Sequence, residues 1–239
     1  MVSGKKRGQE TLVTKKVSIV LRPIMTAIEE TRERIRQKAN DLFFQYGLRS
    51  VSMDDIANAL GISKKTIYQY YADKDELVDA VILSVIGKNQ NCCDEDRRVA
   101  DNAIHEVFLA MEFMMEIFRS MNPSLLYDLQ KYHPKTFERF SKHKNDYLYG
   151  MIRENITRGI KEELYRPELK TDVLSRFRVE SVMLPFHPEF HTRVKSSLVE
   201  IEEEITIHFL YGLVSQKGYK LTLKYQQERS KKIIADAKQ

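Results

Sequence analysis

Apolar residues recur at helical spacing along most of the chain and predict an all-α protein. The first clear stripe lies on a helix from about Ile28 to Tyr46, which Gly47 ends. Its apolar positions follow the spacing of one helix face and are Ile28, Ile35, Ala39, Leu42, Phe43 and Tyr46. Few stretches alternate β-branched and polar residues, so a sheet is not expected.

Two short helices joined by a tight turn follow this first helix. Ser52 is the expected N-cap of a helix from Met53 to Leu60, and Gly61 gives the turn its backbone freedom. Ser63 is then expected to cap a second helix that ends at about Tyr71. One small core should hold the pair together, formed by Ile56, Ala57, Leu60, Ile62 and Ile67.

The outer face of this second helix is rich in hydrogen-bond donors and aromatic rings and contains no acid. It is formed by Lys64, Lys65, Thr66, Tyr68, Gln69 and Tyr70. A helix that reads bases in the major groove of DNA needs such a surface. The pattern therefore predicts a DNA-binding helix-turn-helix.

The remainder of the chain predicts further helices. Asp73 should cap a helix from Lys74 to about Lys88, and the polar run 89–96 is expected to break it. Later helices are expected over Val99–Met121, from Asn122-Pro123, from His133-Pro134 to about Ile160, from a Thr171 cap to Leu184, and from about Thr192 to Val214. These boundaries predict a DNA-binding domain over 25–88, a second domain over 97–218, and a basic tail over 219–239 that is either one more helix or disordered.

Charge is distributed unevenly along the chain. The net charge of +5 equals that of residues 1–24, which hold six basic residues and one acid, whereas 25–82 hold eight basic residues and ten acids. The leader 1–24 lacks helical periodicity and is expected to be disordered or to reflect an early start codon, with a basic arm for the minor groove as the alternative. The DNA-binding prediction therefore depends on where the charges lie, not on their sum.

Composition excludes some classes of protein. Hydrophobic residues at 42% and charged residues at 31% are typical of a soluble globular protein, and no apolar run reaches the roughly 20 residues of a membrane span. Cys92 and Cys93 are adjacent and form no C-x-x-C pattern, so reduced thiols are expected. With no secretory signal, a cytoplasmic location is predicted.

Between about Ile28 and Ala80 the sequence resembles the N-terminal domain of the tetracycline-repressor (TetR) family of bacterial transcription regulators. The resemblance lies in the segments Ala39-x-x-Leu42-Phe43, Tyr46-Gly47, Ser52-Met53-x-x-Ile56-Ala57, Gly61 to Tyr71, and Lys74-Asp75-Glu76-Leu77. Weaker similarity appears from Gly159 to Glu168 and from Leu210 to Gly218. The resemblance implies an all-α homodimer, built on a four-helix bundle, that binds a palindromic double-stranded DNA operator and responds to a small-molecule effector.

The expected DNA contacts follow from side-chain chemistry, and the resemblance places contacts at the same positions. Lys64 or Lys65 can donate to guanine or to a phosphate, Gln69 suits adenine, and Thr66 can meet a thymine methyl or a phosphate. The remaining contacts are expected on phosphates and come from Ser52, Tyr68, Tyr70 and Lys74. Tyr71 is interpreted as a core residue.

A stripe of methionines and aromatic residues in the second domain is the candidate ligand site. It contains Phe108, Met111, Met114, Met115 and Phe118, with Tyr127, Tyr147 and Met151 as residues that would face it. Such a stripe is more often ordinary core, but as a pocket lining it favours a hydrophobic or amphipathic ligand.

Motifs of catalytic and metal sites are weak or absent in the sequence. His187, Glu189 and His191 offer zinc ligands, but the flanking prolines favour an exposed loop, and the acids from Glu200 to Glu204 are interpreted as a solvated helix face. No phosphate loop or nucleophile motif is present, so no enzyme, cofactor or metal is predicted.

The predicted function is a repressor that a ligand releases from DNA. The alternatives are an activator, an inducer-independent regulator, or a helical ligand- or metal-binding protein that does not read DNA.

Overall fold

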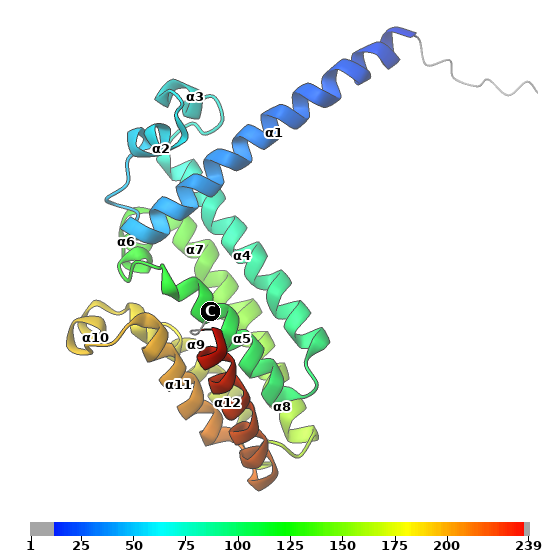
Figure 1. The fold of residues 1–239 in the computed structure, drawn as a ribbon, viewed down its shortest axis with the longest axis vertical. Coiled ribbons are helices and arrows are strands. Elements are labelled where there is room, and N and C mark those ends of the chain that lie inside the picture. Colours follow the sequence, from blue (N-terminus) through cyan, green and yellow to red (C-terminus); the bar gives the residue numbers. More distant parts are fainter. Residues whose placement is uncertain (1–11, 237–239) are drawn as a thin grey trace, which may run out of the picture.

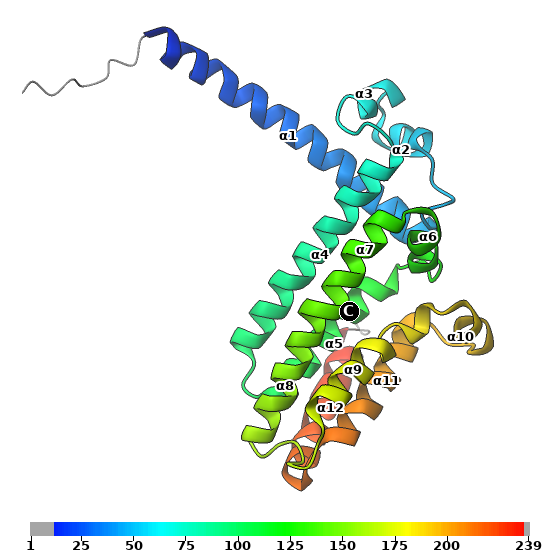
Figure 2. The same cartoon turned by 180° about the vertical axis from the view of Figure 1, so that it is seen from behind.

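The computed structural model describes residues 12–236; the side chains of 12–26, of Pro188 and His191, and of 232–236 lie outside the described residues, as do residues 1–11 of the predicted leader. Within that part the regular secondary structure is helical, apart from one isolated antiparallel bridge between Tyr165 and Val214 (Figures 1 and 2). The α-helices are α1 Leu12–Tyr46, α2 Met53–Leu60, α3 Lys64–Tyr68, α4 Lys74–Val99, α5 Ala103–Arg119, α6 Leu125–Tyr132, α7 Pro134–Lys142, α8 Tyr149–Lys161, α9 Thr171–Ser181, α10 Pro188–Arg193, α11 Leu198–Leu213 and α12 Gln216–Asp236. A π-helical segment, His143–Leu148, joins α7 to α8, and a 3-10 turn, Leu184–Phe186, precedes α10.

Helix α1 begins at Leu12, well before the predicted start at Ile28, so the prediction of a leader without helix is wrong from Leu12 onward. Residues 12–22 contain no glycine or proline, and Pro23 lies within α1. The apolar stripe marks the part of the helix that is buried and not its full length. Ile35, Ala39 and Phe43 are fully buried, whereas Ile28 and Tyr46 are 49% and 51% exposed. Among the described side chains of α1, it is therefore those of the later turns that pack in a core.

Helix α4 continues through the polar run 89–96, where a break was predicted. These polar residues are paired at the contact with the next helices, which explains the difference. The Tyr147 hydroxyl donates to the Gln90 carbonyl and to Asp94 Oδ1, over 3.0 and 2.8 Å. Gln90 Nε2 also lies 3.4 Å from Nδ1 of His143. A long α4 therefore joins the helix-turn-helix end of the molecule to the helical bundle.

Several predicted helix starts are shifted by a few residues. Asn102 caps α5 by accepting hydrogen bonds from two backbone amides. The helix predicted to start at Val99 therefore starts only after Asn102, and Val99 is the last residue of α4. Pro123 precedes α6, which starts at Leu125, instead of opening it. Thr171 is the first residue of α9 and not its cap.

The end of the chain is more ordered than the sequence predicted. A capping box between Ser197 and Glu200 starts α11, later than the predicted Thr192. Residues 219–236 of the predicted basic tail lie within α12. This helix packs on α5 through the ring of Tyr225 against Phe108, and Arg229 forms an ion pair with Glu203 of α11. Of the two alternatives for the tail, the helix is the correct one over these described residues.

The first hydrophobic core joins the two predicted domains. It contains Ile35, Phe43, Ile56 and other buried residues of α1 to α4, and also Leu125 and Leu129 of α6. The core of α2 and α3 is as predicted: Ile56, Ala57 and Ile67 are buried, and Leu60 and Ile62 pack against them. Helix α6 is therefore part of the base on which the helix-turn-helix is built.

Of the helices described, none is long and apolar enough to cross a membrane.

Candidate nucleic-acid interface and ligand cavity

Local caps fix the helix-turn-helix, as the sequence predicted. Ser52 and Asp55 form a capping box at the start of α2, and Gly61 ends that helix with a left-handed φ of 67°. The Ser63 side chain accepts the Thr66 backbone N–H over 3.1 Å at the start of α3. Helix α3 ends at Tyr68, three residues earlier than predicted, and Gln69 and Tyr70 continue it as a turn.

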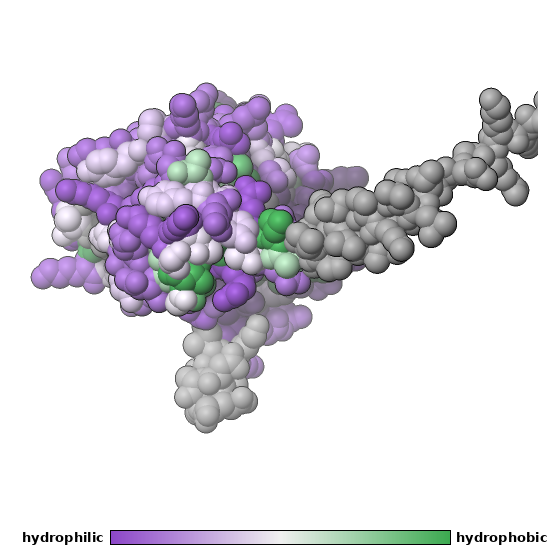
Figure 3. All heavy atoms as spheres, turned by 90° about the horizontal axis from the view of Figure 1, so that it is seen from above, coloured by the Kyte–Doolittle hydropathy of each residue, from purple (hydrophilic) through white to green (hydrophobic). Residues whose placement is uncertain are grey.

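The predicted reading face is presented to solvent at one end of the molecule. Lys64, Lys65, Tyr68 and Gln69 are exposed, and Thr66 and Tyr70 are half-buried. Seen from this end, the surface is largely hydrophilic with small, separate apolar areas (Figure 3). Lys65 and Gln69 have no side-chain partner among the described residues, so their donors are available to a ligand such as DNA.

The two lysines differ in their surroundings. Lys64 Nζ lies 2.7 Å from Oδ2 of Asp54 in α2, and this hydrogen-bonded pair raises the pKa of the Lys64 ammonium. DNA phosphates would have to approach next to the Asp54 carboxylate. Lys65 carries no such internal counter-charge.

Two of the residues predicted to contact DNA have hydroxyl groups that already form hydrogen bonds within the protein. Ser52 Oγ donates to Asp55 Oδ2 over 2.7 Å and accepts from the Asp55 backbone over 3.2 Å. Thr66 Oγ1 lies 2.8 Å from Ser63 Oγ. Both side chains hold helix starts in place, and a phosphate could use only their remaining hydrogen-bonding capacity.

Lys74 does not present its ammonium as the sequence analysis expected. Its Nζ donates to the carbonyl oxygens of Leu48 and Val51, over 2.5 Å each, and lies 5.7 Å from the centre of the Phe43 ring. Burial lowers the pKa of this ammonium. Lys74 therefore ties the start of α4 to the segment between α1 and α2, and we correct its assignment from phosphate contact to structural tie.

Tyr71 is a core residue, as interpreted from the sequence. It is almost fully buried, and its hydroxyl donates to the Arg32 carbonyl over 3.1 Å. The Arg32 guanidinium lies over the Tyr71 ring at 5.2 Å, and Arg32 also pairs with Glu76 of α4. These contacts connect α1, the end of the helix-turn-helix and α4.

A cavity of about 240 Å³ lies in the helical bundle below the DNA-binding end. Helices α1, α4, α5, α6, α8, α9 and α11 all contribute to its lining. The lining is largely apolar and includes Phe44, Ile82, Ile86, Val107, Phe113, Ile117, Leu125, Leu126, Ile152, Val179, Met183, Phe186 and Phe209. This volume exceeds more than tenfold the roughly 10–15 Å³ that one water needs, so the cavity has room for an organic molecule.

Half of the predicted ligand residues line this cavity, namely Met111, Met114, Phe118 and Met151. The other four predicted positions lie elsewhere. Phe108 packs on Tyr225, at 5.5 Å between ring centres, and Met115 Sδ accepts from Arg229 over 3.0 Å. Both are therefore core residues beneath α12.

Tyr127 and Tyr147 also lie outside the cavity. Tyr127 is exposed on α6, where Lys131 Nζ donates to its hydroxyl over 3.3 Å. Tyr147 stacks on His143 and bonds to α4. Both were expected to face the stripe from other helices, but neither lines the cavity.

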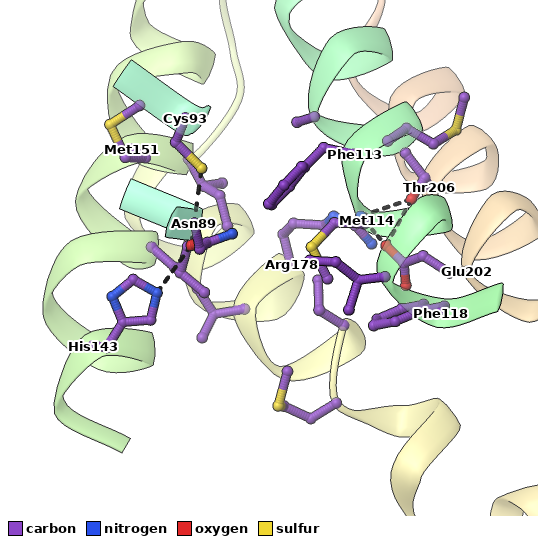
Figure 4. Close-up of a pocket in the computed structure, with 18 of the residues that line it drawn as sticks. Asn89, Cys93, Phe113, Met114, Phe118, His143, Met151, Arg178, Glu202 and Thr206 are labelled. Carbon is purple, nitrogen blue, oxygen red and sulfur yellow. Dashed lines mark hydrogen bonds and ion pairs between the residues drawn. The ribbon is translucent and has the colours of Figure 1, made fainter. Parts of the chain in front are cut away.

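Polar side chains lie on two opposite walls of the cavity (Figure 4). On one side, Nε2 of His143 donates to Oδ1 of Asn89 over 3.0 Å, and Sγ of Cys93 approaches the same oxygen at 4.0 Å. Burial raises the pKa of the Cys93 thiol to about 12 and lowers that of His143. Both groups are therefore neutral at physiological pH.

The opposite wall holds a buried ion pair that the sequence analysis missed. Nη2 of Arg178 lies 2.6 Å from Oε1 of Glu202. Glu202 is buried, so the prediction of a solvated helix face over 200–204 is wrong at this position. The sequence signal for the burial of Glu202 was its i, i+4 spacing from Thr206, which places both residues on the same helix face as Phe209.

No group of three or more metal-binding side chains occurs among the described residues. The segment at 188–193 forms the short helix α10, so the prediction of a loop there is wrong. His187 is its N-cap, and the side chain of His191 lies outside the described residues.

Comparison with known proteins agrees with this geometry. Residues 35–81 match the family of bacterial regulatory proteins described as the tetR family. The HTH-type transcriptional regulator YvaF of Bacillus subtilis is 25% identical over 195 residues, which cover 77% of this chain and 96% of YvaF. The HTH-type transcriptional repressor KstR2 of Mycobacterium tuberculosis is 23% identical over 156 residues, which cover 63% of this chain and 76% of KstR2.

Solved structures share the fold. A TetR-family regulator of Agrobacterium tumefaciens superposes with a TM-score of 0.67 at 15% identity, over 79% of this chain and all (100%) of that one. The structure of KstR2, described as a ketosteroid transcriptional regulator, superposes with a TM-score of 0.57 at 18% identity, over 78% of this chain and 96% of its own. The family is one of DNA-binding regulators and not of enzymes, as predicted. The helix-turn-helix part of the chain, residues 35–81, therefore matches the TetR family of transcriptional regulators, and the chain shares the fold of a solved structure of that family.

Proposed function

We propose that this regulator is a homodimeric repressor that leaves a palindromic operator when a small hydrophobic molecule fills the cavity. One observation carries the proposal: the same cavity that could hold a ligand is lined by Phe44 of α1 and by Leu125 of α6, which belong to the base of the helix-turn-helix. A ligand there would touch the DNA-binding end directly.

On the DNA side, Lys65 and Gln69 are the side chains best placed to read bases. Both are exposed and unpartnered among the described residues, and they lie one helical turn apart. Lysine can donate to guanine O6 or N7, and the glutamine amide can pair with adenine. Tyr68 and Tyr70 flank them and suit phosphate contacts.

A second copy of the chain would supply the other half of the reading surface. Helix α9 exposes Val173 and Phe177, at 61% and 55%, and these residues are one turn apart on one face. Apolar side chains on a helix face are typical of a subunit interface. Two-fold symmetry would then present two α3 helices to successive major grooves and require a palindromic operator.

The proposed response to ligand is a shift between two forms of the dimer. A ligand releases DNA only if it binds more tightly to the form whose α3 helices are wrongly spaced. Helix α4 lines the cavity through Ile82, Val85 and Ile86 and begins at Lys74, next to α3. It is therefore the element that we expect to transmit the shift.

Repression is supported by the relative KstR2, whose name describes a transcriptional repressor. The test is a reporter placed behind DNA from upstream of this chain's own gene, assayed with and without the protein. We expect expression to fall when the protein is present and a two-fold symmetric footprint to appear on the purified DNA. A rise in expression would instead establish an activator, and a footprint without symmetry would contradict the dimeric arrangement.

A further inference from the structure

The ion pair on the cavity wall has an unused hydrogen-bonding capacity. Nη2 of Arg178 (α9) donates to Oε1 of Glu202 over 2.6 Å and to Oγ1 of Thr206 over 2.7 Å. Thr206 donates in turn to the same Glu202 oxygen over 2.9 Å (Figure 4). These bonds use one nitrogen of the guanidinium and one oxygen of the carboxylate.

The two remaining terminal atoms of the pair are buried without partners. Nη1 of Arg178 and Oε2 of Glu202 have no hydrogen-bond partner among the described residues. The side chains are 12% and 1% exposed, so bulk water does not replace a partner there. An unpaired buried donor or acceptor is costly, and both residues line the cavity. The wall of the cavity thus holds one unpaired donor and one unpaired acceptor.

Building on the ligand-responsive function proposed above, we propose that Arg178 and Glu202 bind a neutral hydroxyl group on the hydrophobic ligand. A hydroxyl oxygen accepts from Nη1 of Arg178 while its proton is donated to Oε2 of Glu202. The ligand class is therefore an apolar alcohol or phenol, whose carbon skeleton lies among Phe113, Met114 and Phe118.

Charge excludes the ionised alternatives. The guanidinium and the carboxylate already neutralise each other, so a bound carboxylate would add a second negative charge beside buried Glu202. An ammonium group would similarly meet Arg178. At low dielectric such an unbalanced charge is strongly disfavoured. A hydroxyl satisfies both orphaned atoms and adds no charge.

The test is displacement of the neutral dye N-phenyl-1-naphthylamine by 1-decanol, decanoate and decylammonium at neutral pH. Because an alcohol partitions into any apolar pocket better than an ion, the quantity to compare is the ratio of decanol to decanoate affinity in wild type and in variants. Glu202→Gln removes the repelling charge, and we expect it to shift this ratio toward decanoate by about tenfold or more. The matched control is Glu204→Gln, an exposed change on the same helix, which should leave the ratio unchanged.

Arg178→Met provides the reciprocal test, since the ratio of decanol to decylammonium should shift toward the ammonium. If one variant fails to fold, as judged by helical circular dichroism, the affinity ratio of the other variant tests the hydroxyl assignment. Dye displaced by decanol with unchanged ratios in the folded variants would overturn the hydroxyl assignment and leave the hydrophobic cavity site standing. Failure of the wild-type protein to bind dye or decanol would overturn the proposed ligand response itself, and the hydroxyl assignment with it.

Discussion

The backbone N–H of Asn122 donates to the carbonyl oxygen of Phe44 over 2.6 Å and thereby ties the turn between α5 and α6 to helix α1. Phe44 also lines the cavity. Nearby, the backbone N–H of Arg49 donates to Asp128 of α6 over 3.3 Å. The segment that leads into the helix-turn-helix is thus held by the elements that would touch a ligand.

Phe44→Leu should weaken the link between the cavity and DNA binding. We expect DNA affinity without ligand to change little, but the coupling free energy between decanol and DNA to fall by about 0.5–2 kcal/mol. Anisotropy titrations of labelled operator with and without decanol measure this quantity. The control is Phe113→Leu, a matched change in a cavity residue of α5, and an equal loss of coupling in both variants would contradict a specific role for Phe44.

Asp54→Asn should increase affinity for DNA. The change frees Lys64 from its ion pair and removes an acid beside the expected phosphate path. We expect about two- to tenfold tighter binding at low salt and a smaller gain as salt screens the charges. Asp101→Asn, an exposed acid between α4 and α5, has the same change of net charge and should leave binding almost unaltered. Equal gains in the two variants would indicate only a global charge effect.

Lys74→Met should destabilise the fold without removing a phosphate contact. The change leaves the carbonyls of Leu48 and Val51 without their donor, at a cost of about 1–3 kcal/mol in the free energy of unfolding. Urea denaturation measures the cost. The slope of log K against log salt for DNA binding should stay the same, and a decrease in its magnitude by about 0.9 would show that Lys74 does neutralise a phosphate.

His143 should make the protein less stable in mild acid. Burial lowers its pKa below the ordinary value of 6.5, so on acidification the unfolded chain takes up a proton before the folded chain does. The free energy of unfolding should therefore fall as pH drops below about 6.5, until the lowered pKa of the folded state is passed. The neutral ring fits its site because Nε2 donates to Asn89 while Nδ1 faces the Gln90 amide.

His143→Gln should reduce this pH dependence by about 1.4 kcal/mol for each unit by which the pKa is lowered. Urea unfolding at neutral pH and in mild acid measures it. His187→Gln, at an exposed histidine, is the control. If both variants retain the wild-type pH dependence, other groups are responsible.

The helix-turn-helix was predictable because its determinants are local. Gly61 and the caps Ser52, Ser63 and Asp73 each act within a few residues of sequence, and the structure confirms all four. The reading face followed from the same periodicity. Lys74 escaped prediction because its partners lie on the segment between α1 and α2, far away in sequence.

The cavity was predictable only in part, since its walls come from helices distant in the chain. Met111, Met114 and Phe118 share one face of α5, which periodicity revealed. Glu202 was interpreted as solvated because its partner Arg178 lies 24 residues away on another helix. Likewise, the polar residues that extend α4 looked like a break until the facing helices supplied partners.

The most direct test of DNA reading is the affinity of purified protein for DNA upstream of its own gene, measured against excess nonspecific competitor. Wild-type protein should bind specifically, and Lys64→Ala/Lys65→Ala should lose about tenfold or more of that affinity while its oligomeric state is unchanged. The matched control is Lys220→Ala/Lys224→Ala on α12, which carries the same loss of charge far from α3 (Figure 1). Equal affinity in the two double variants would contradict the assignment of α3 as the reading helix.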